Sequence, residues 1–87
     1  MNTDLQTLRN EIDKIDASII ELLSQRKNLS EAIGKLKVTL EKEIVDVNRE
    51  NYLKARYVKL SEKYHLSAEF IINLFKIIIQ NSRDCQK

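Results

Sequence analysis

Apolar residues in the first half of the chain recur at alternating intervals of three and four positions. The repeat comprises Leu5, Leu8, Ile12, Ile15, Ile19 and Leu22 and resumes with Leu29, Ile33, Leu36 and Leu40. This spacing predicts one amphipathic helix of about 35 residues, which would span about 50 Å. A compact chain of this length has a diameter of only about 30 Å. The helix therefore needs a partner to cover its apolar stripe, and a two-fold homodimer is the commonest solution.

Two shorter helices are predicted in the second half. Residues 39–44 interrupt the repeat and indicate a connector, and a helix should begin near Val45 or Asp46, where a carboxylate is favourable. A turn at residues 64–66 then precedes Ser67, the predicted N-cap of a third helix that runs almost to the C-terminus. The second helix carries an apolar stripe of Leu53, Tyr57, Leu60 and Tyr64. We expect the third helix to bury Phe70, Ile71, Leu74, Phe75 and Ile78.

The composition supports a small helical protein. The absence of proline and the presence of a single glycine, Gly34, make helix the default. A glycine inside the long helix could allow close approach of another backbone or of a ligand, or it could be a neutral substitution that the helix tolerates. Hydrophobic residues make up 43% of the chain, which gives a thin core for a monomer. The formal net charge of +2 is too small to indicate a nucleic acid or an anionic membrane as partner.

Two further features bear on location and chemistry. No apolar run reaches the ~18 residues of a membrane span, and residues 1–4 lack the layout of a signal peptide. We therefore expect a cytoplasmic protein. Cys85 is the single cysteine, so an internal disulfide is excluded and no metal-ligand cluster is formed. Cys85 and the single histidine, His65, are interpreted as bystanders, and no metal or other cofactor is predicted.

Arg26 interrupts the apolar repeat between Leu22 and Leu29. A buried guanidinium is costly unless it meets an anion, which either a structural ion pair or a bound ligand would supply. Lys37 lies within about 20° of the same helix face, with Ile33 between the two cations. Two cations over an apolar floor suit a small carboxylate ligand, although Lys37 taken alone would be a solvated lysine.

Two other polar groups are candidates for the same site. Asp46, Arg49 and Glu50 cluster within one turn of the second helix, which alone is most often a solvated face. Ile79, Ser82 and Gln86 share one face of the third helix. They could line a pocket, or they could be the fraying end of a helix.

The order and spacing of several segments resemble the all-helical chorismate mutases. The matching segments are Leu8–Asp16, Leu22–Arg26, Ile33–Lys37, Val45–Asp46, Arg49–Glu50, Phe75–Ile78 and Ser82–Gln86. They cover essentially the whole chain, so residues 1–87 are expected to form one chorismate mutase domain. The resemblance implies an all-α fold with one long and two shorter helices per chain, in an intertwined, domain-swapped homodimer with two equivalent active sites.

The resemblance also implies an isomerase that converts chorismate to prephenate in phenylalanine and tyrosine biosynthesis. Arg9 from the partner subunit and Arg26 would hold the two substrate carboxylates. Lys37 and Gln86 would donate hydrogen bonds to the ether oxygen, and Lys37 would also contact a carboxylate. Because Arg9 lies about 25 Å from Arg26 along one helix, the two cannot clamp one small ligand from the same chain.

The remaining family positions complete the pocket that the resemblance implies. Asp46 and Glu50 match residues that meet the ring hydroxyl, Ser82 matches a carboxylate contact, and Arg49 matches an arginine near the substrate. The apolar wall would consist of Ile33, Val45 and Ile79.

Three alternatives remain open from the sequence. An isochorismate pyruvate-lyase on the same fold would use the same cations, although the pattern at residues 45–50 is more similar to the mutase. A helical dimerisation module would have no activity. The chain could also be the mutase portion of a longer bifunctional enzyme.

Overall fold

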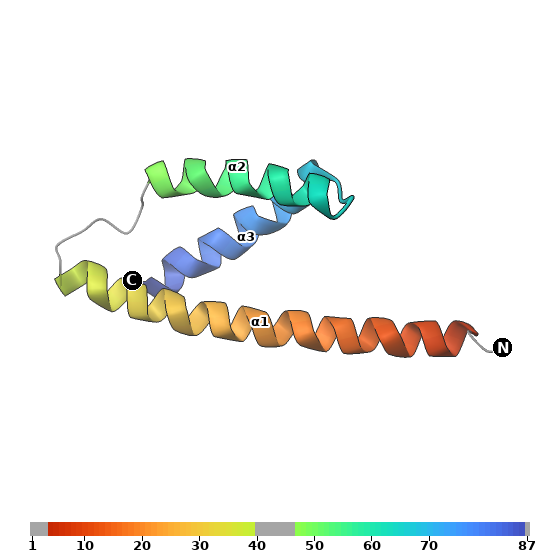
Figure 1. Ribbon diagram of the computed structural model, residues 1–87. Coiled ribbons are helices and arrows are strands. Elements are labelled where there is room, and N and C mark those ends of the chain that lie inside the picture. The colour runs from red at the N-terminus through yellow and green to blue at the C-terminus, as the bar shows by residue number, and fades with distance from the viewer. Residues whose placement is uncertain (1–3, 40–46, 87) are drawn as a thin grey trace.

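Three helices make up the described part of the computed structural model, which comprises residues 4–39 and 47–86 (Figure 1). They are α1 (Leu5–Thr39), α2 (Val47–Lys63) and α3 (Ala68–Gln86), and these residues contain no strand. The 35 residues of α1 confirm the long helix that the apolar repeat predicts. The predicted connector and the start of the second helix fall mostly on residues 40–46, outside the described residues.

Asp4 caps the N-terminus of α1. Its carboxylate accepts a hydrogen bond from the backbone N–H of Thr7 at 2.8 Å, which satisfies one of the helix's unpaired donors. This hydrogen bond favours the ionised form and lowers the pKa of Asp4 from its ordinary value. The carboxylate therefore also fixes where the long helix begins.

The turn between α2 and α3 is closed without glycine. His65 adopts a left-handed φ of 58°, and the N–H of Leu66 donates to the carbonyl of Ser61 at 2.9 Å. Together with the bond from the His65 N–H to the Glu62 carbonyl at 3.3 Å, this is a Schellman motif. Ser67 Oγ then accepts from the N–H of Phe70 at 3.2 Å, so the predicted turn and the predicted N-cap are both confirmed.

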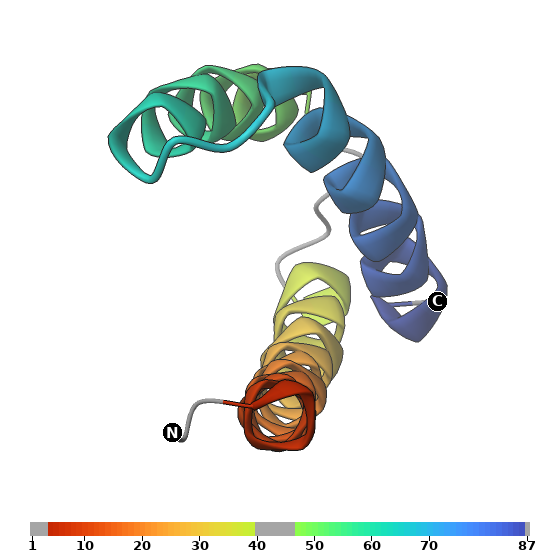
Figure 2. The same ribbon diagram turned by 90° about the vertical axis from the view of Figure 1, so that its right-hand side faces the viewer.

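Helix α3 packs against both α1 and α2, and thereby positions the other two helices (Figure 2). Between α2 and α3 the rings of Tyr57 and Phe75 stack with their centroids 4.2 Å apart. Tyr57 is 7% exposed, and Ser61 Oγ donates to its carbonyl at 2.6 Å. This contact is the centre of the small core that the chain builds by itself.

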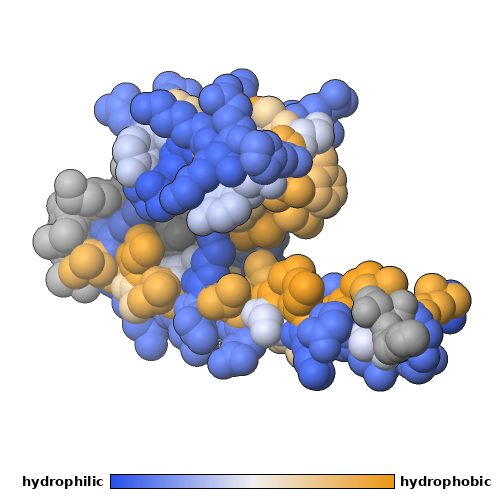
Figure 3. Space-filling model, turned by 45° about the vertical axis from the view of Figure 1, so that its right-hand side comes forward, coloured by the Kyte–Doolittle hydropathy of each residue, from blue (hydrophilic) through white to orange (hydrophobic). Residues whose placement is uncertain are grey.

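Much of the predicted core is exposed in the single chain. Phe70 and Leu74, expected to be buried, are 56% and 40% exposed, and hydrophobic residues run in a row along α1 (Figure 3). The chain measures 59 × 24 × 16 Å and exposes 7251 Å², whereas a compact monomer of this size exposes about 5,300 Å². The helical period identifies the apolar faces correctly, but the chain's own helices do not cover them.

Candidate functional site

A cleft of about 370 Å³ is lined by residues of all three helices. The lining consists of Arg26, Leu29, Ser30, Ile33, Lys37, Arg49, Glu50, Leu53, Ile79, Ser82 and Arg83. Leu29, Ile33, Leu53 and Ile79 are its apolar members, and Arg26, Lys37, Arg49, Glu50 and Arg83 are its charged members. This volume lies within the range of about 300–1,000 Å³ that is typical of small-molecule sites.

The cleft brings together predicted residues from distant parts of the sequence. Arg26 and Lys37 come from α1, Glu50 from α2, and Ser82 from α3. The predicted wall residues Ile33 and Ile79, as well as Arg49, also line this cleft. From the sequence alone, these residues could also have been part of a solvated charged face or of a fraying helix end. The fold instead places them in one cleft.

Four predicted residues are not placed in the cleft. Arg9 is exposed in the N-terminal half of α1 and is not among the lining residues. At 17 positions before Arg26, it lies about 25 Å away along the helix. Asp46 lies outside the described residues, as does the wall residue Val45, and so does the side chain of Gln86. Their roles stay predictions.

A hydroxyl group on α3 holds the guanidinium of Arg26. Arg26 Nη1 donates to Ser82 Oγ, and Ser82 Oγ donates in turn to the carbonyl of Ile78 at 3.1 Å. Within the described residues Arg26 forms no ion pair, so they do not supply the carboxylate that a structural ion pair requires. The arginine is half-buried and faces the cleft with capacity for an external anion.

Glu50 forms an ion pair with Arg83 that joins α2 to α3. The side chains are 30% and 29% exposed, respectively, and both residues line the cleft. Sequence reasoning missed Arg83, although it directly follows Ser82. No spacing in the sequence singled out Arg83, and the nearby residues Asn81 and Asp84 are exposed.

Ser30 is the second lining residue that sequence reasoning missed. It is 5% exposed and lies one turn after Arg26, whereas Gly34 lies one turn further and is also buried. Spacing of four residues along a helix places all three on one face. The sequence feature that could have revealed Ser30 is therefore the pair of small residues, Ser30 and Gly34, on the helix face between the two cations.

The described lining has an excess of positive charge. It contains four cations, Arg26, Lys37, Arg49 and Arg83, against the single carboxylate of Glu50. Arg49 also lies over the ring of Tyr52, 5.1 Å from its centroid. Several cations together with apolar side chains favour a small ligand with more than one carboxylate.

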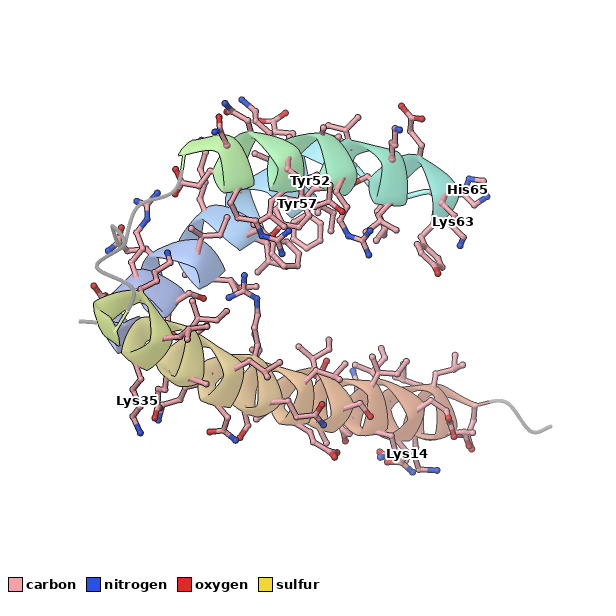
Figure 4. All side chains as sticks on the ribbon, turned by 60° about the vertical axis from the view of Figure 1, so that its left-hand side comes forward. Lys14, Lys35, Tyr52, Tyr57, Lys63 and His65 are labelled. Atoms are coloured by element: carbon pink, nitrogen blue, oxygen red, sulfur yellow. The ribbon has the colours of Figure 1, made fainter. Side chains whose placement is uncertain are left out.

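The residues interpreted as bystanders lie elsewhere. Figure 4 shows His65 at the far end of α2, and neither His65 nor Cys85 lines the cleft. Within residues 4–39 and 47–86, no group of histidine, cysteine, aspartate and glutamate side chains could hold a metal ion. No helix in that part of the chain is long and apolar enough to cross a membrane.

Residues 8–87 match the family described as chorismate mutase type II. The chain belongs to this family. A chorismate mutase of Methanocaldococcus jannaschii is 31% identical over 83 residues, covering 95% of this chain and 84% of the relative. The similarity therefore extends over nearly the whole of the present chain and most of the relative.

Two further comparisons extend this result. A bifunctional chorismate mutase/prephenate dehydratase of Buchnera aphidicola is 38% identical over 86 residues, covering 99% of this chain but 22% of the relative. The chain thus spans about a fifth of that bifunctional relative. A solved structure, a conserved hypothetical protein from Pyrococcus furiosus, superposes with a TM-score of 0.77 at 37% identity and covers 100% of both chains.

Proposed function

We propose that the chain is a chorismate mutase that rearranges chorismate to prephenate in phenylalanine and tyrosine biosynthesis. The observation that carries the proposal is the cleft whose lining brings together Arg26, Lys37, Glu50 and Ser82 with apolar side chains. Membership of the chorismate mutase type II family supports the same activity. A cytoplasmic location and independence from cofactors belong to the proposal as well.

The reaction suits a site built from cations and hydrogen-bond donors. In a [3,3] rearrangement the ether C–O bond breaks while a new C–C bond forms, and no nucleophile or proton transfer is required. Catalysis then comes from holding the flexible dianion in its reactive conformer and from stabilising negative charge that develops on the ether oxygen. In the proposed roles, Arg26 binds a substrate carboxylate, and Lys37 and Gln86 donate to the ether oxygen.

The other side of the substrate is assigned to α2 and α3. Glu50 and Asp46 accept a hydrogen bond from the ring hydroxyl, and Ser82 contacts a carboxylate or orients Arg26 toward it. The existing bond from Arg26 to Ser82 supports this arrangement because both groups already face the cleft.

The active form is proposed to be an intertwined homodimer in which Arg9 of the partner subunit completes each site. Two observations support it. The N-terminal half of α1 exposes an apolar row, with Ile12 55%, Ile15 58% and Ile19 49% exposed, and covering such a row releases about 25 cal/mol per Å². In addition, Arg9 is too far from Arg26 in its own chain to share a small ligand with it. A second copy would satisfy both requirements.

A direct assay tests this function. Purified protein is incubated with chorismate, and chorismate loss is followed by absorbance while prephenate is identified chromatographically. We expect saturable conversion to prephenate. Pyruvate release from isochorismate without prephenate formation would identify the lyase instead. An inert protein whose melting temperature is unchanged by a transition-state analogue would be a dimerisation module, since a ligand that binds the folded state raises this temperature.

A further inference from the structure

The ion pair between Glu50 and Arg83 differs from two ion pairs within α1. Lys14–Glu11 and Lys27–Glu31 each lie within α1, three or four positions apart, with well-exposed side chains. Glu50 and Arg83 instead come from two helices, and each is about one-third exposed at the wall of the cleft. An ion pair in this position acts on the site as well as on the packing of α2 against α3.

A carboxylate at this position conflicts with the charge of the proposed substrate. Glu50 must offer an oxygen to the ring hydroxyl, yet an unpaired negative charge would repel a dianion in the same cleft. A neighbouring guanidinium resolves the conflict, because it cancels the charge while its planar fork fixes the orientation of the carboxylate. One oxygen of Glu50 pairs with Arg83, and the other can accept from the hydroxyl.

Two adjacent residues of α3 thus bind side chains from two different helices. Ser82 holds Arg26 of α1, and Arg83 holds Glu50 of α2. We propose that Arg83 is a positioning residue that orients Glu50 and neutralises its charge, so that the cleft accepts a dianion. This role rests on the proposed function, in which Glu50 meets the substrate.

The test is a double-mutant cycle on chorismate turnover, with kcat and KM measured for wild type, Arg83→Gln, Glu50→Gln and the double variant. Arg83→Gln removes the guanidinium that pairs with Glu50 and should raise KM about tenfold, within the range of coupling between contacting charges. In the Glu50→Gln background there is no charge to compensate, so Arg83→Gln should change KM by less than about twofold. The effect of Arg83→Gln on KM should therefore depend on which residue occupies position 50. Lys59→Gln, which removes one positive charge from an exposed position of α2 outside the cleft, is the matched control.

The outcomes separate the possibilities. If Arg83 binds substrate itself, Arg83→Gln will raise KM equally with Glu50 or Gln at position 50. If Arg83 only stabilises the fold, Arg83→Gln will lower the melting temperature and leave KM unchanged. Either result overturns the proposal. The comparison of Glu50→Gln with the double variant tests direct substrate binding by Arg83 even if Arg83→Gln alone does not fold, as checked by circular dichroism. A KM of Arg83→Gln equal to that of Lys59→Gln also overturns it. Wild-type protein that forms no prephenate overturns the proposed function itself, and the role of Arg83 with it.

Discussion

Replacing Arg26 with alanine should abolish most of the activity while leaving the fold intact. The guanidinium is half-buried in the cleft and is oriented by Ser82. If it binds a substrate carboxylate through two charge-assisted hydrogen bonds, each contributes about 1.5–3 kcal/mol. The loss of about 3–6 kcal/mol corresponds to a fall in kcat/KM of about 10²- to 10⁴-fold.

Stability should respond much less than activity to this change. Within the described residues Arg26 forms no ion pair, so its removal leaves no carboxylate there without a partner, and the free energy of unfolding should change by about 1 kcal/mol or less. Arg26→Lys should also be poor, because a point charge does not reproduce the fork of arginine.

The assay is initial-rate kinetics on chorismate, with thermal unfolding of the same samples. Lys14→Ala is the control, since Figure 4 shows Lys14 pointing away from α2 and α3 and its pair with Glu11 is exposed. Its kcat/KM should stay within about twofold of wild type. Turnover by Arg26→Ala near the wild-type rate would refute the assignment of Arg26 to the substrate.

Three further changes probe the site and the helix ends. Gln86→Glu should be active only at low pH, because a protonated glutamate donates to the ether oxygen whereas an ionised one repels the developing charge; a flat pH–rate profile would remove Gln86 from that position. Ser67→Ala should lower the free energy of unfolding by about 1 kcal/mol through loss of the α3 cap, measured against Ser18→Ala, whose hydroxyl bonds only the Lys14 carbonyl within α1; equal losses would show that the cap is unimportant. The lowered pKa of Asp4 means that its ionised form stabilises the folded state above the ordinary pKa, and that this stabilisation is lost as the pH falls through the lowered value. Asp4→Ala should therefore reduce thermal stability at neutral pH but not in strong acid, and an equal reduction at both would contradict the role of the charge.

Local periodicity was sufficient to predict the helices and part of the site. The spacing of apolar residues gave the length of α1, and the same period placed Arg26 and Lys37 on one face. Ser67 was recognisable as a cap because a serine before an apolar-periodic segment satisfies the first free N–H groups of a helix. Asp4 also precedes an apolar-periodic segment and caps its helix, but it was not recognised as a cap from the sequence.

Properties that depend on packing between helices could not be predicted. The pairing of Glu50 with Arg83 is set by how α2 and α3 pack, and their sequence separation carries no trace of it. Likewise, the period that marks Phe70 and Leu74 as apolar identifies a face to be covered but not the surface that covers it. In the single chain both remain exposed, which is why the dimer is a proposal about a second copy.

Subunit exchange between two inactive variants tests the shared site most directly. Arg9→Ala and Arg26→Ala chains are mixed in equal amounts, and exchange is verified with mass-tagged chains. If each site combines Arg26 of one chain with Arg9 of the partner, every heterodimer has one intact site and one doubly damaged site. Random pairing then restores about a quarter of wild-type activity, since half of the dimers carry one good site of two. If verified exchange restores nothing, Arg9 and Arg26 do not meet across the dimer, and the proposed active site is wrong.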